Sequence, residues 1–362
     1  MREGQRISGG LKAVLAIAAG LSVANIYYNQ TLIGVMSQEF NHNLRMIHLM
    51  PAATQLGYAL GLLLLVPLGD AMKRRELILW QTGALIVSLG ITALAPSAFI
   101  LLLASIFVGA AATVAQQIIP LAAEMAQPHE RGKVVGTVMS GLLAGILLAR
   151  TVSGFVGAYL GWRGMYVIGA LIAVLLGIML FIGLPGQHQQ KRLSYPELML
   201  SIVRLTAAYP ALRWSVMRQG ALFAAFSAFW TILALFLYGP PYHMGSDFAG
   251  LFGIIGLVGV LVAPIAGRIA DTRGHSRVIV VGEILVLAGF AIFMFYPTLV
   301  GLGCGIVLMD GGVQMAMVAN QSVIFALNQE ARNRLNTIYM TGMFLWGAVG
   351  SVAASIAWDI QG

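Results

Sequence analysis

The chain has 362 residues, of which 59% are hydrophobic and only 9% charged, and its mean hydropathy is +0.86. Soluble globular domains carry roughly 25% charged residues, so this composition excludes an ordinary soluble domain and predicts an integral membrane protein. The net charge of +8 does not indicate a nucleic-acid partner. The cations cluster in short turns between apolar segments, as they do in the loops of membrane proteins.

Eleven apolar segments are predicted to cross the membrane as helices. A spanning helix needs about 20 mostly apolar residues. The segments that meet this criterion lie at about 12–36, 47–69, 77–96, 98–123, 134–158, 164–184, 214–238, 248–268, 277–296, 298–325 and 335–358. The sequence therefore predicts an all-α integral membrane protein that passes through the bilayer many times.

One long polar break divides these segments into a group of six and a group of five. The break covers 185–213, and within it 195–205 is predicted to form a short amphipathic helix on the membrane surface. We expect an N-terminal half at 1–184, a cytoplasmic linker at 185–213 and a C-terminal half at 214–362.

Lysine and arginine residues fall mainly on one side of this predicted topology. Of the 21, only Arg45 and Arg163 lie on the other side, and Arg150 lies within a span. Cytoplasmic loops of membrane proteins carry an excess of lysine and arginine. The bias therefore predicts that the N-terminus and the central linker are cytoplasmic.

The two groups of helices carry matching residues at a constant separation. Asp70 and Asp271 lie 201 positions apart, and the same offset pairs Gly141 with Gly342. This predicts one hydrophobic unit of about 200 residues used twice, a plan that many transporters use around a central site. The offset also places the mate of the sixth helix beyond residue 362. We therefore expect a twelve-helix plan shortened by one helix, and the alternative is an ancestor with eleven helices.

The charged turns carry a resemblance to a known family. The stretch Gly267-Arg268-Ile269-Ala270-Asp271-Thr272-Arg273-Gly274 resembles the motif between helices 2 and 3, and again between helices 8 and 9, of the major facilitator superfamily. Val23 to Gln30 and Leu148 to Gly154 look like a bacterial branch grouped with proton-driven efflux permeases, and the chain is similar to uncharacterised enterobacterial members of that branch. The resemblance covers the whole chain. It implies a secondary transporter of two pseudo-symmetric helical halves in the bacterial inner membrane.

The chain departs from the family pattern at positions that bear on proton coupling. The family's helix-4 arginine, often linked to proton coupling in antiporters, corresponds to Ser105 in this sequence. The helix-5 Gly-Pro pair of many antiporters corresponds to Ala149 and Arg150. The usual residue set for proton coupling is therefore missing from these positions.

Each aspartate of the repeated turn ends a helix and is followed by basic residues. Asp70 precedes Arg74 and Arg75, and Asp271 precedes Arg273. A carboxylate that faces basic groups of a neighbouring segment forms a charge-assisted contact. A contact made only while the cytoplasmic side is closed would bias the alternating-access equilibrium. We expect these five residues to act in gating, and the alternative is that the cations only fix the topology.

Three ionisable residues stand out inside the predicted spans. A charged side chain in the bilayer costs several kcal/mol, so each is expected to face a cavity or a partner. Asp310, halfway along the tenth helix, is expected to bind substrate and exchange protons, or else to be a structural partner of Arg150. Arg150 is expected either to bind an anionic substrate or to counter the charge of Asp310. Glu283 in the ninth helix is a second candidate for proton coupling, with a structural role as the alternative.

Polar and aromatic residues at helical spacing complete the predicted substrate site. Asp310 begins a stripe that continues with Gln314, and the repeat offset matches this stripe to the face of the fourth helix that carries Gln116. The resemblance implies that helices 1, 4, 7 and 10 line the cavity. For Asn29 and Gln116, hydrogen bonding between helices is the alternative role. The predicted substrate-binding residues are Asn25, Tyr28, Asn29, Gln116, Arg150, Trp230, Asp310 and Gln314.

No motif in the sequence predicts an enzyme. The six histidines have no metal-ligand spacing and no Gly-Lys-Ser/Thr motif is present, so neither a metal nor a cofactor is expected. We expect a monomer that moves a small molecule across the inner membrane by alternating access, outward in exchange for protons, with membrane lipid as its surroundings. The alternatives are a truncated, inactive remnant of such a transporter and an uptake permease of the same fold.

Overall fold

The computed structural model describes residues 8–127, 129–185, 194–328 and 331–361. Within these ranges it leaves out the side chains of residues 41, 257–260, 263, 264, 271 and 361. All regular elements in the described ranges are helices, as the composition predicts. Nine helical stretches in this part of the chain are long and apolar enough to cross a membrane.

Three of the predicted N-terminal spans are interrupted helices. They consist of α1 (Gly9–Ala24) with α2 (Tyr28–Glu39), α4 (Met50–Leu64) with α5 (Leu68–Ala71), and α7 (Ala98–Ala111) with α8 (Val114–Met125). Between them lie η1 (Asn41–Asn43), α3 (Leu44–His48) and α6 (Arg74–Ala93). At the first break the side-chain amide of Asn25 donates to the carbonyl oxygens of Leu21 and Ser22, at 2.8 and 3.2 Å. These hydrogen bonds give the two carbonyl groups partners, which lipid could not provide.

The fifth and sixth predicted spans form one continuous element, α9 (Arg131–Gly183). The turn between the spans is confined to Gly161, whose φ of 71° is readily adopted only by glycine. We expected a break of several residues between 158 and 164. The helix instead continues to the residue before Gly161 and resumes directly after it.

The C-terminal part of the chain begins with a short helix, α10 (Tyr195–Ala208), which matches the predicted amphipathic segment. Residues 186–193 of the predicted linker lie outside the described ranges. The spanning helices that follow are α11 (Pro210–Tyr238), α12 (Ser246–Ile255) with α13 (Leu257–Arg273), α14 (His275–Phe295), α15 (Leu299–Leu327) and α16 (Arg332–Gln361).

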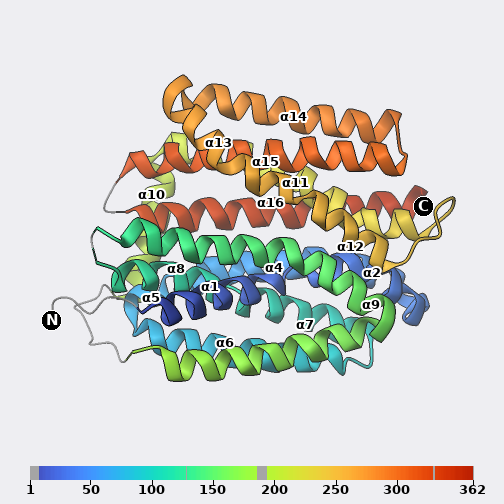
Figure 1. Ribbon diagram of the computed structural model, residues 1–362, viewed down its shortest axis with the longest axis horizontal. Coiled ribbons are helices and arrows are strands. Elements are labelled where there is room, and N and C mark those ends of the chain that lie inside the picture. The colour runs from blue at the N-terminus through green and yellow to red at the C-terminus, as the bar shows by residue number, and fades with distance from the viewer. Residues whose placement is uncertain (1–7, 128, 186–193, 329–330, 362) are drawn as a thin grey trace.

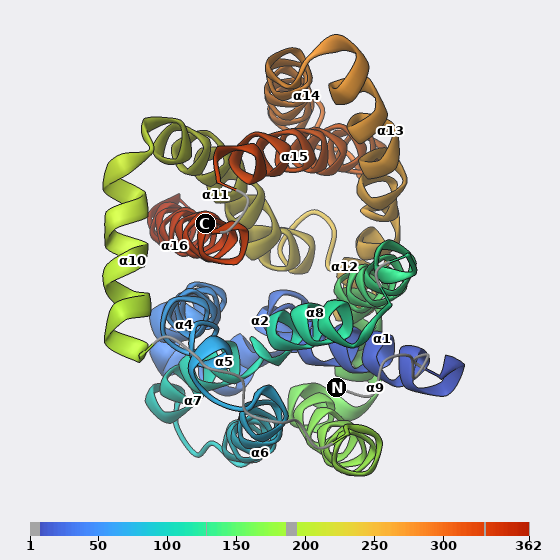
Figure 2. The same ribbon diagram turned by 90° about the vertical axis from the view of Figure 1, so that its left-hand side faces the viewer.

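The long helices lie roughly parallel in two groups side by side (Figure 1). We call α1 to α9 the N-terminal half and α11 to α16 the C-terminal half. The halves meet along two seams, where α9 packs against α12 and α4 packs against α16. At one end of the helices α10 crosses from one half to the other (Figure 2), and the Tyr195 hydroxyl donates to the carbonyl oxygen of Leu64 at 3.0 Å. We call this end the α10 side.

Two glycines paired by the repeat offset occupy matching helix crossings. A Cβ atom on Gly141 would lie 2.2 Å from the carbonyl oxygen of Ala16, where the fifth span crosses the first. A Cβ atom on Gly342 would lie 2.3 Å from a side-chain carbon of Val216, where the eleventh span crosses the seventh. Close approach of membrane helices requires small residues at such crossings. The two halves therefore repeat the same packing contact, as the duplication predicts.

Candidate functional site

A cavity of about 560 Å³ lies between the two halves. Its walls come from α1, α4, α8 and α9 on one side and from α11, α15 and α16 on the other. It extends from Asp310, near the middle of α15, to Arg332 and Asn333 at the start of α16, which are both exposed. The cavity therefore opens toward the α10 side.

Four of the predicted substrate-binding residues line this cavity. They are Gln116, Arg150, Asp310 and Gln314. The stripe that begins at Asp310 lies along the wall for its whole length, because Met317 and Gln321 are also in the lining. Because α15 is unbroken, helical spacing read from the sequence gives the correct face of this helix. The binding roles of these residues stay predictions.

Arg150 lies at the inner end of the cavity and is almost fully buried. Its Nε donates to the side-chain oxygen of Gln30 at 2.8 Å. The guanidinium carbon lies 4.1 Å from the ring centroid of Trp230, 4.6 Å from that of Tyr27 and 5.4 Å from that of Phe226. Cation–π contacts of this kind stabilise a desolvated cation without neutralising it. The second terminal nitrogen, Nη2, has no hydrogen-bond partner among the described residues.

Asp310 is buried beside the junction of α12 and α13. A Cβ atom on Gly256 at that junction would lie 2.6 Å from Oδ2 of Asp310, so the absence of a side chain there makes room for the carboxyl group. Oδ1 has no hydrogen-bond partner in the described part of the chain. Asp310 and Arg150 interact electrostatically through space, but they form no ion pair within the described ranges.

The first span contributes to the cavity lining, but not through Asn25, Tyr28 and Asn29. Asn25 bonds to carbonyl oxygens of its own helix, and Asn29 donates to the hydroxyl of Thr54 at 2.7 Å. Tyr28 is buried, and none of these three residues belongs to the cavity lining. The break between α1 and α2 changes the helical phase, so that Tyr27 lines the cavity instead.

Trp230 and Glu283 also lie outside the cavity lining. Trp230 is only 1% exposed and contributes to the site through its contact with Arg150. Glu283 on α14 accepts hydrogen bonds from Nε and Nη2 of Arg218 on α11, at 2.8 and 2.9 Å. Glu283 is one partner of a half-buried ion pair between two helices, an arrangement that favours the structural role named above as the alternative to proton coupling.

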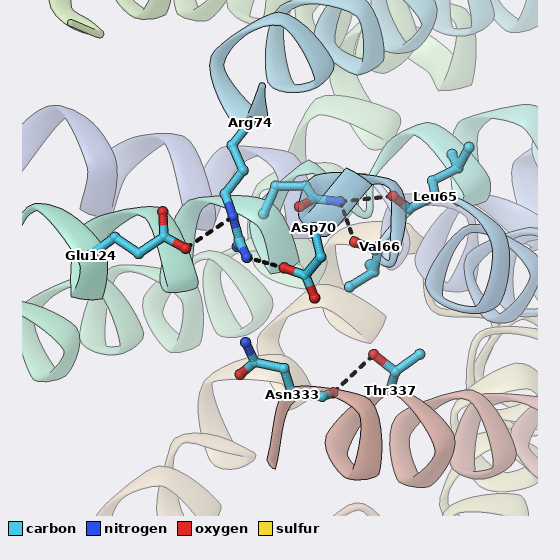
Figure 3. A network of polar contacts seen from close by, with 8 residues as sticks. Leu65, Val66, Asp70, Arg74, Glu124, Asn333 and Thr337 are labelled. Carbon is cyan, nitrogen blue, oxygen red and sulfur yellow. Dashed lines mark hydrogen bonds and ion pairs between the residues drawn. The ribbon is translucent and has the colours of Figure 1, made fainter. Parts of the chain in front are cut away.

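The predicted gating residues are divided among different environments, and Figure 3 shows that of Asp70 and Arg74. Asp70 accepts a hydrogen bond from Arg74 at 2.5 Å, and Arg74 also contacts Glu124 at 3.3 Å. Arg75 does not join this cluster, because it donates to the carbonyl oxygen of Phe181 at 2.9 Å. In the second turn Arg273 is exposed, and the side chain of Asp271 lies outside the described part of the structure.

Asn333 and Thr337 of α16 lie across a small pocket from Asp70 (Figure 3). The pocket is lined from both halves, with Pro67 and Asp70 on one side and Arg334 on the other. Asp70 and Arg74 therefore lie where the two halves face each other at the α10 side.

At the end opposite the α10 side, hydrogen bonds join the two halves. Gln55 of α4 donates to Ser351 of α16 and accepts from Ser227 of α11, both at 3.0 Å. Within the C-terminal half Thr231 donates to Ser351 at 3.0 Å and so holds one of these partners in place. Farther along the same seam His48 contacts Asp359 at 2.6 Å.

The α9–α12 seam is closed at the same end of the molecule by small residues. Ser246 donates to the carbonyl oxygen of Gly154 at 2.9 Å, and Thr151 donates to that of Gly250 at 3.0 Å. The cavity is thus closed on the side where both seams are hydrogen-bonded.

Comparisons with known proteins agree with this architecture. The sequence profile of the Major Facilitator Superfamily matches residues 15–351. The chain is 38% identical to the uncharacterized transporter YgaY of Escherichia coli. The alignment extends over 362 residues and covers 100% of this chain and 92% of that protein. It is 32% identical over 353 residues to the "Probable transporter SCO4007" of Streptomyces coelicolor, covering 96% and 81% of the two chains.

Solved structures share the fold at low sequence identity. A bacterial homolog of the human lysosomal transporter Spinster, inward-facing and occupied, matches with a TM-score of 0.77, 17% identity and coverage of 98% of this chain and 82% of that one. A D-xylose-proton symporter matches with a TM-score of 0.70, 17% identity and coverage of 94% and 88%. The chain therefore belongs to the major facilitator superfamily, and it is a multi-pass membrane transporter of that type.

Proposed function

We propose that the protein exports a small molecule from the bacterial cytoplasm in exchange for protons. The observation that carries this proposal is the environment of Asp310, a buried carboxyl group that lines the cavity and whose Oδ1 finds no hydrogen-bond partner among the described residues. An intramembrane acid is expensive unless it has a function. A carboxyl group that binds a proton in one conformation and releases it in another couples the movement of the two halves to a proton gradient.

The proposed membrane is the bacterial inner membrane, with the N-terminus and the α10 side in the cytoplasm. The excess of lysine and arginine on that side supports this orientation. In this orientation the structure corresponds to an inward-facing state, because the cavity opens on the α10 side and hydrogen bonds join the halves on the other. The proposed functional unit is a monomer of two halves, covering 1–184 and 214–362, with 185–213 as the cytoplasmic linker.

The outward direction is supported by one of the relatives. The "Multidrug resistance protein B homolog" of Mycobacterium tuberculosis is 22% identical to this chain over 424 aligned positions. A "D-xylose transporter" of Levilactobacillus brevis is 34% identical, but over only 127 residues, which cover 34% of this chain. The direction of proton movement distinguishes the two possibilities. Protons move opposite to the solute in the proposed export, and together with it in uptake by a symporter.

Purified protein in liposomes with a trapped pH-sensitive dye tests this proposal. The liposomes are loaded with benzenesulfonate, benzyltrimethylammonium or phenyl glucoside, so that an anion, a cation and a neutral solute are compared, and are then diluted into solute-free buffer. Acidification of the lumen as a solute leaves is the expected result for antiport. Alkalinisation would instead indicate a symporter, and solute exit without a pH change would remove proton coupling.

Glu283 provides the contrast to Asp310. Because its carboxylate is paired with Arg218, we expect Glu283→Gln to leave proton-coupled flux intact and to lower the free energy of unfolding by about 1 kcal/mol. The loss arises because Arg218 remains half-buried without its partner. Thermal unfolding and lumen acidification are measured on the same preparation. Restoration of stability by adding Arg218→Met confirms the structural role, and loss of flux in Glu283→Gln contradicts it.

We propose further that Asp70, Arg74, Arg75, Asp271 and Arg273 act in gating, with Asp70 as the central group of the first turn. The proposal is supported by the position of Asp70 beside the pocket that separates it from α16. When the α10 side closes, the start of α16 approaches this turn. A charge-assisted hydrogen bond between Asp70 and the side chain of Asn333 then stabilises the closed state.

Replacing Asp70 by Asn is expected to slow transport several-fold while leaving benzenesulfonate binding unchanged. A neutral amide forms a weaker hydrogen bond than a carboxylate, so the closed state on the α10 side is less populated. The rate of lumen acidification measures the effect. Glu76→Gln is the matched control, because Glu76 is exposed and contacts only Lys73 in its ion pair. Equal rates for the Asp70 variant and the wild type would exclude a gating role.

A further inference from the structure

The inner end of the cavity holds a cation that makes no ion pair with any carboxylate of the described residues. Arg150 is 2% exposed, and its Nε bonds to the neutral side chain of Gln30. Its Nη2 has no hydrogen-bond partner in the described ranges. An unused donor on a buried charged group is costly, whereas an anionic acceptor at the same place forms a strong, charge-assisted bond.

The surroundings of Arg150 preserve its charge. Three rings, those of Tyr27, Phe226 and Trp230, lie within 5.4 Å of its guanidinium carbon. Aromatic faces favour the charged guanidinium and hold its plane in place. The group is therefore held ready to bind an anion, and it need not leave an ion pair with Asp310 to do so.

The charges in the cavity lining favour an anionic ligand. Among the described lining residues the basic side chains are those of Arg150 and Arg332, and the acidic side chain is that of Asp310. The lining is thus net cationic, and it becomes more so whenever Asp310 carries a proton. A cavity of one sign with low-dielectric walls concentrates ligands of the opposite sign.

The cavity walls between these charged residues are suited to the apolar part of a ligand. Phe223 stacks on Phe226 with ring centroids 5.3 Å apart and meets Phe344 edge-on at 5.0 Å. Methionines contribute further to the lining, including Met317 and Met343. Methionine side chains are flexible and polarisable, so they adapt to ligands of different outline.

We infer that the cavity binds small organic anions, with a carboxylate or sulfonate group on Arg150 and an aromatic or aliphatic body against the phenylalanine and methionine wall. This inference rests on the proposed transport function of the same cavity and adds the class of substrate. It also assigns the specificity for the anion to Arg150, rather than to the exposed Arg332 at the mouth.

Ligand-induced thermal stabilisation of the detergent-purified protein tests the inference without any gradient. Benzenesulfonate, benzenesulfonamide and benzyltrimethylammonium have similar apolar bodies and differ in charge. The wild type is expected to be stabilised by benzenesulfonate in a saturable way, and by the other two compounds much less. Arg150→Gln is expected to weaken the apparent affinity for benzenesulfonate by roughly tenfold to a hundredfold, the size of one charge-assisted hydrogen bond.

Two further variants keep the test decisive. Arg150→Lys retains the charge and should bind benzenesulfonate with intermediate affinity, even if Arg150→Gln does not fold. Arg45→Gln removes the same charge from an exposed position on α3 and should bind like the wild type. The inference is overturned if benzenesulfonate does not stabilise the protein, if the sulfonamide or the ammonium compound binds as well, or if Arg150→Gln or Arg150→Lys binds like the wild type.

The outcome is separable from that of the proposed function. If benzenesulfonate binds through Arg150 but its exit from liposomes moves no protons, the anion site stands and the proton antiport fails. If proton-coupled exit occurs only with benzyltrimethylammonium or phenyl glucoside, the antiport stands and the anion site fails.

Discussion

Asp310→Asn is expected to abolish proton-coupled flux while leaving the protein folded. The asparagine has nearly the same shape, so the fit against Gly256 is retained. The amide cannot take up and release a proton, so solute exit from liposomes no longer acidifies the lumen. The thermal unfolding temperature should be equal to or higher than that of the wild type. A neutral amide costs less to bury without a full set of partners than a carboxylate does.

The control for this prediction is Asp247→Asn at the start of α12. Asp247 is partly exposed and does not line the cavity, so the same chemical change there should leave the flux near the wild-type value. Proton-coupled flux that survives in Asp310→Asn, in liposomes that show solute exit, would show that another group carries the proton. Loss of folding in Asp310→Asn would instead contradict the expectation that the carboxyl group is not needed for stability.

Gly154→Leu is expected to open the cavity to the opposite side. A Cβ atom on Gly154 would lie 2.4 Å from the carbonyl oxygen of Ser246 and 2.8 Å from Cα of Gly250. A leucine there prevents the close contact between α9 and α12 that closes this side in the structure, and we expect the contact to be absent when this side is open. Overpacking of a tight contact costs about 1–3 kcal/mol. The population should therefore shift by roughly fivefold to a hundredfold toward the state that is open on that side.

The accessibility of a single cysteine measures this shift. With Cys304 changed to Ser, Phe226→Cys places a thiol at the inner end of the cavity. A membrane-impermeant maleimide should reach it from the α10 side in the parent protein, and from the opposite side when Gly154→Leu is added. Gly136→Leu is the matched control on the same helix, because a Cβ atom there would have no neighbour within 4 Å. Unchanged labelling in a folded Gly154 variant would mean that another contact closes this side.

Sequence pattern predicted the cavity wall well on α15, but it misplaced Trp230 on α11, although both helices are continuous. On α15 the positions of Asp310, Gln314, Met317 and Gln321 follow helical spacing without interruption, and all four line the cavity. Arg150 was predicted for a different reason, because an arginine inside an apolar span needs a partner or a cavity. The overall fold was predicted from composition, apolar segments and the repeated turns.

Sequence pattern failed where the chain breaks a helix or pairs distant residues. The break between α1 and α2 rotates the second part of the first span, so Asn25 and Asn29 bond to backbone and to α4 rather than facing the cavity. The pairing of Glu283 with Arg218 joins helices 65 positions apart in sequence, and single-sequence periodicity carries no information on that contact. The contact of Gln30 with Arg150 was missed for the same reason.

The helix α10 has a mechanical consequence for the motion between the halves. One of its ends is fixed to the N-terminal half through the Tyr195 hydroxyl, and the other leads through Tyr209 directly into α11. A helix of 14 residues holds its ends about 21 Å apart. It therefore works as a strut of fixed length between α4 and α11. We expect the halves to pivot about this strut while their separation at the edge that it spans stays close to this length.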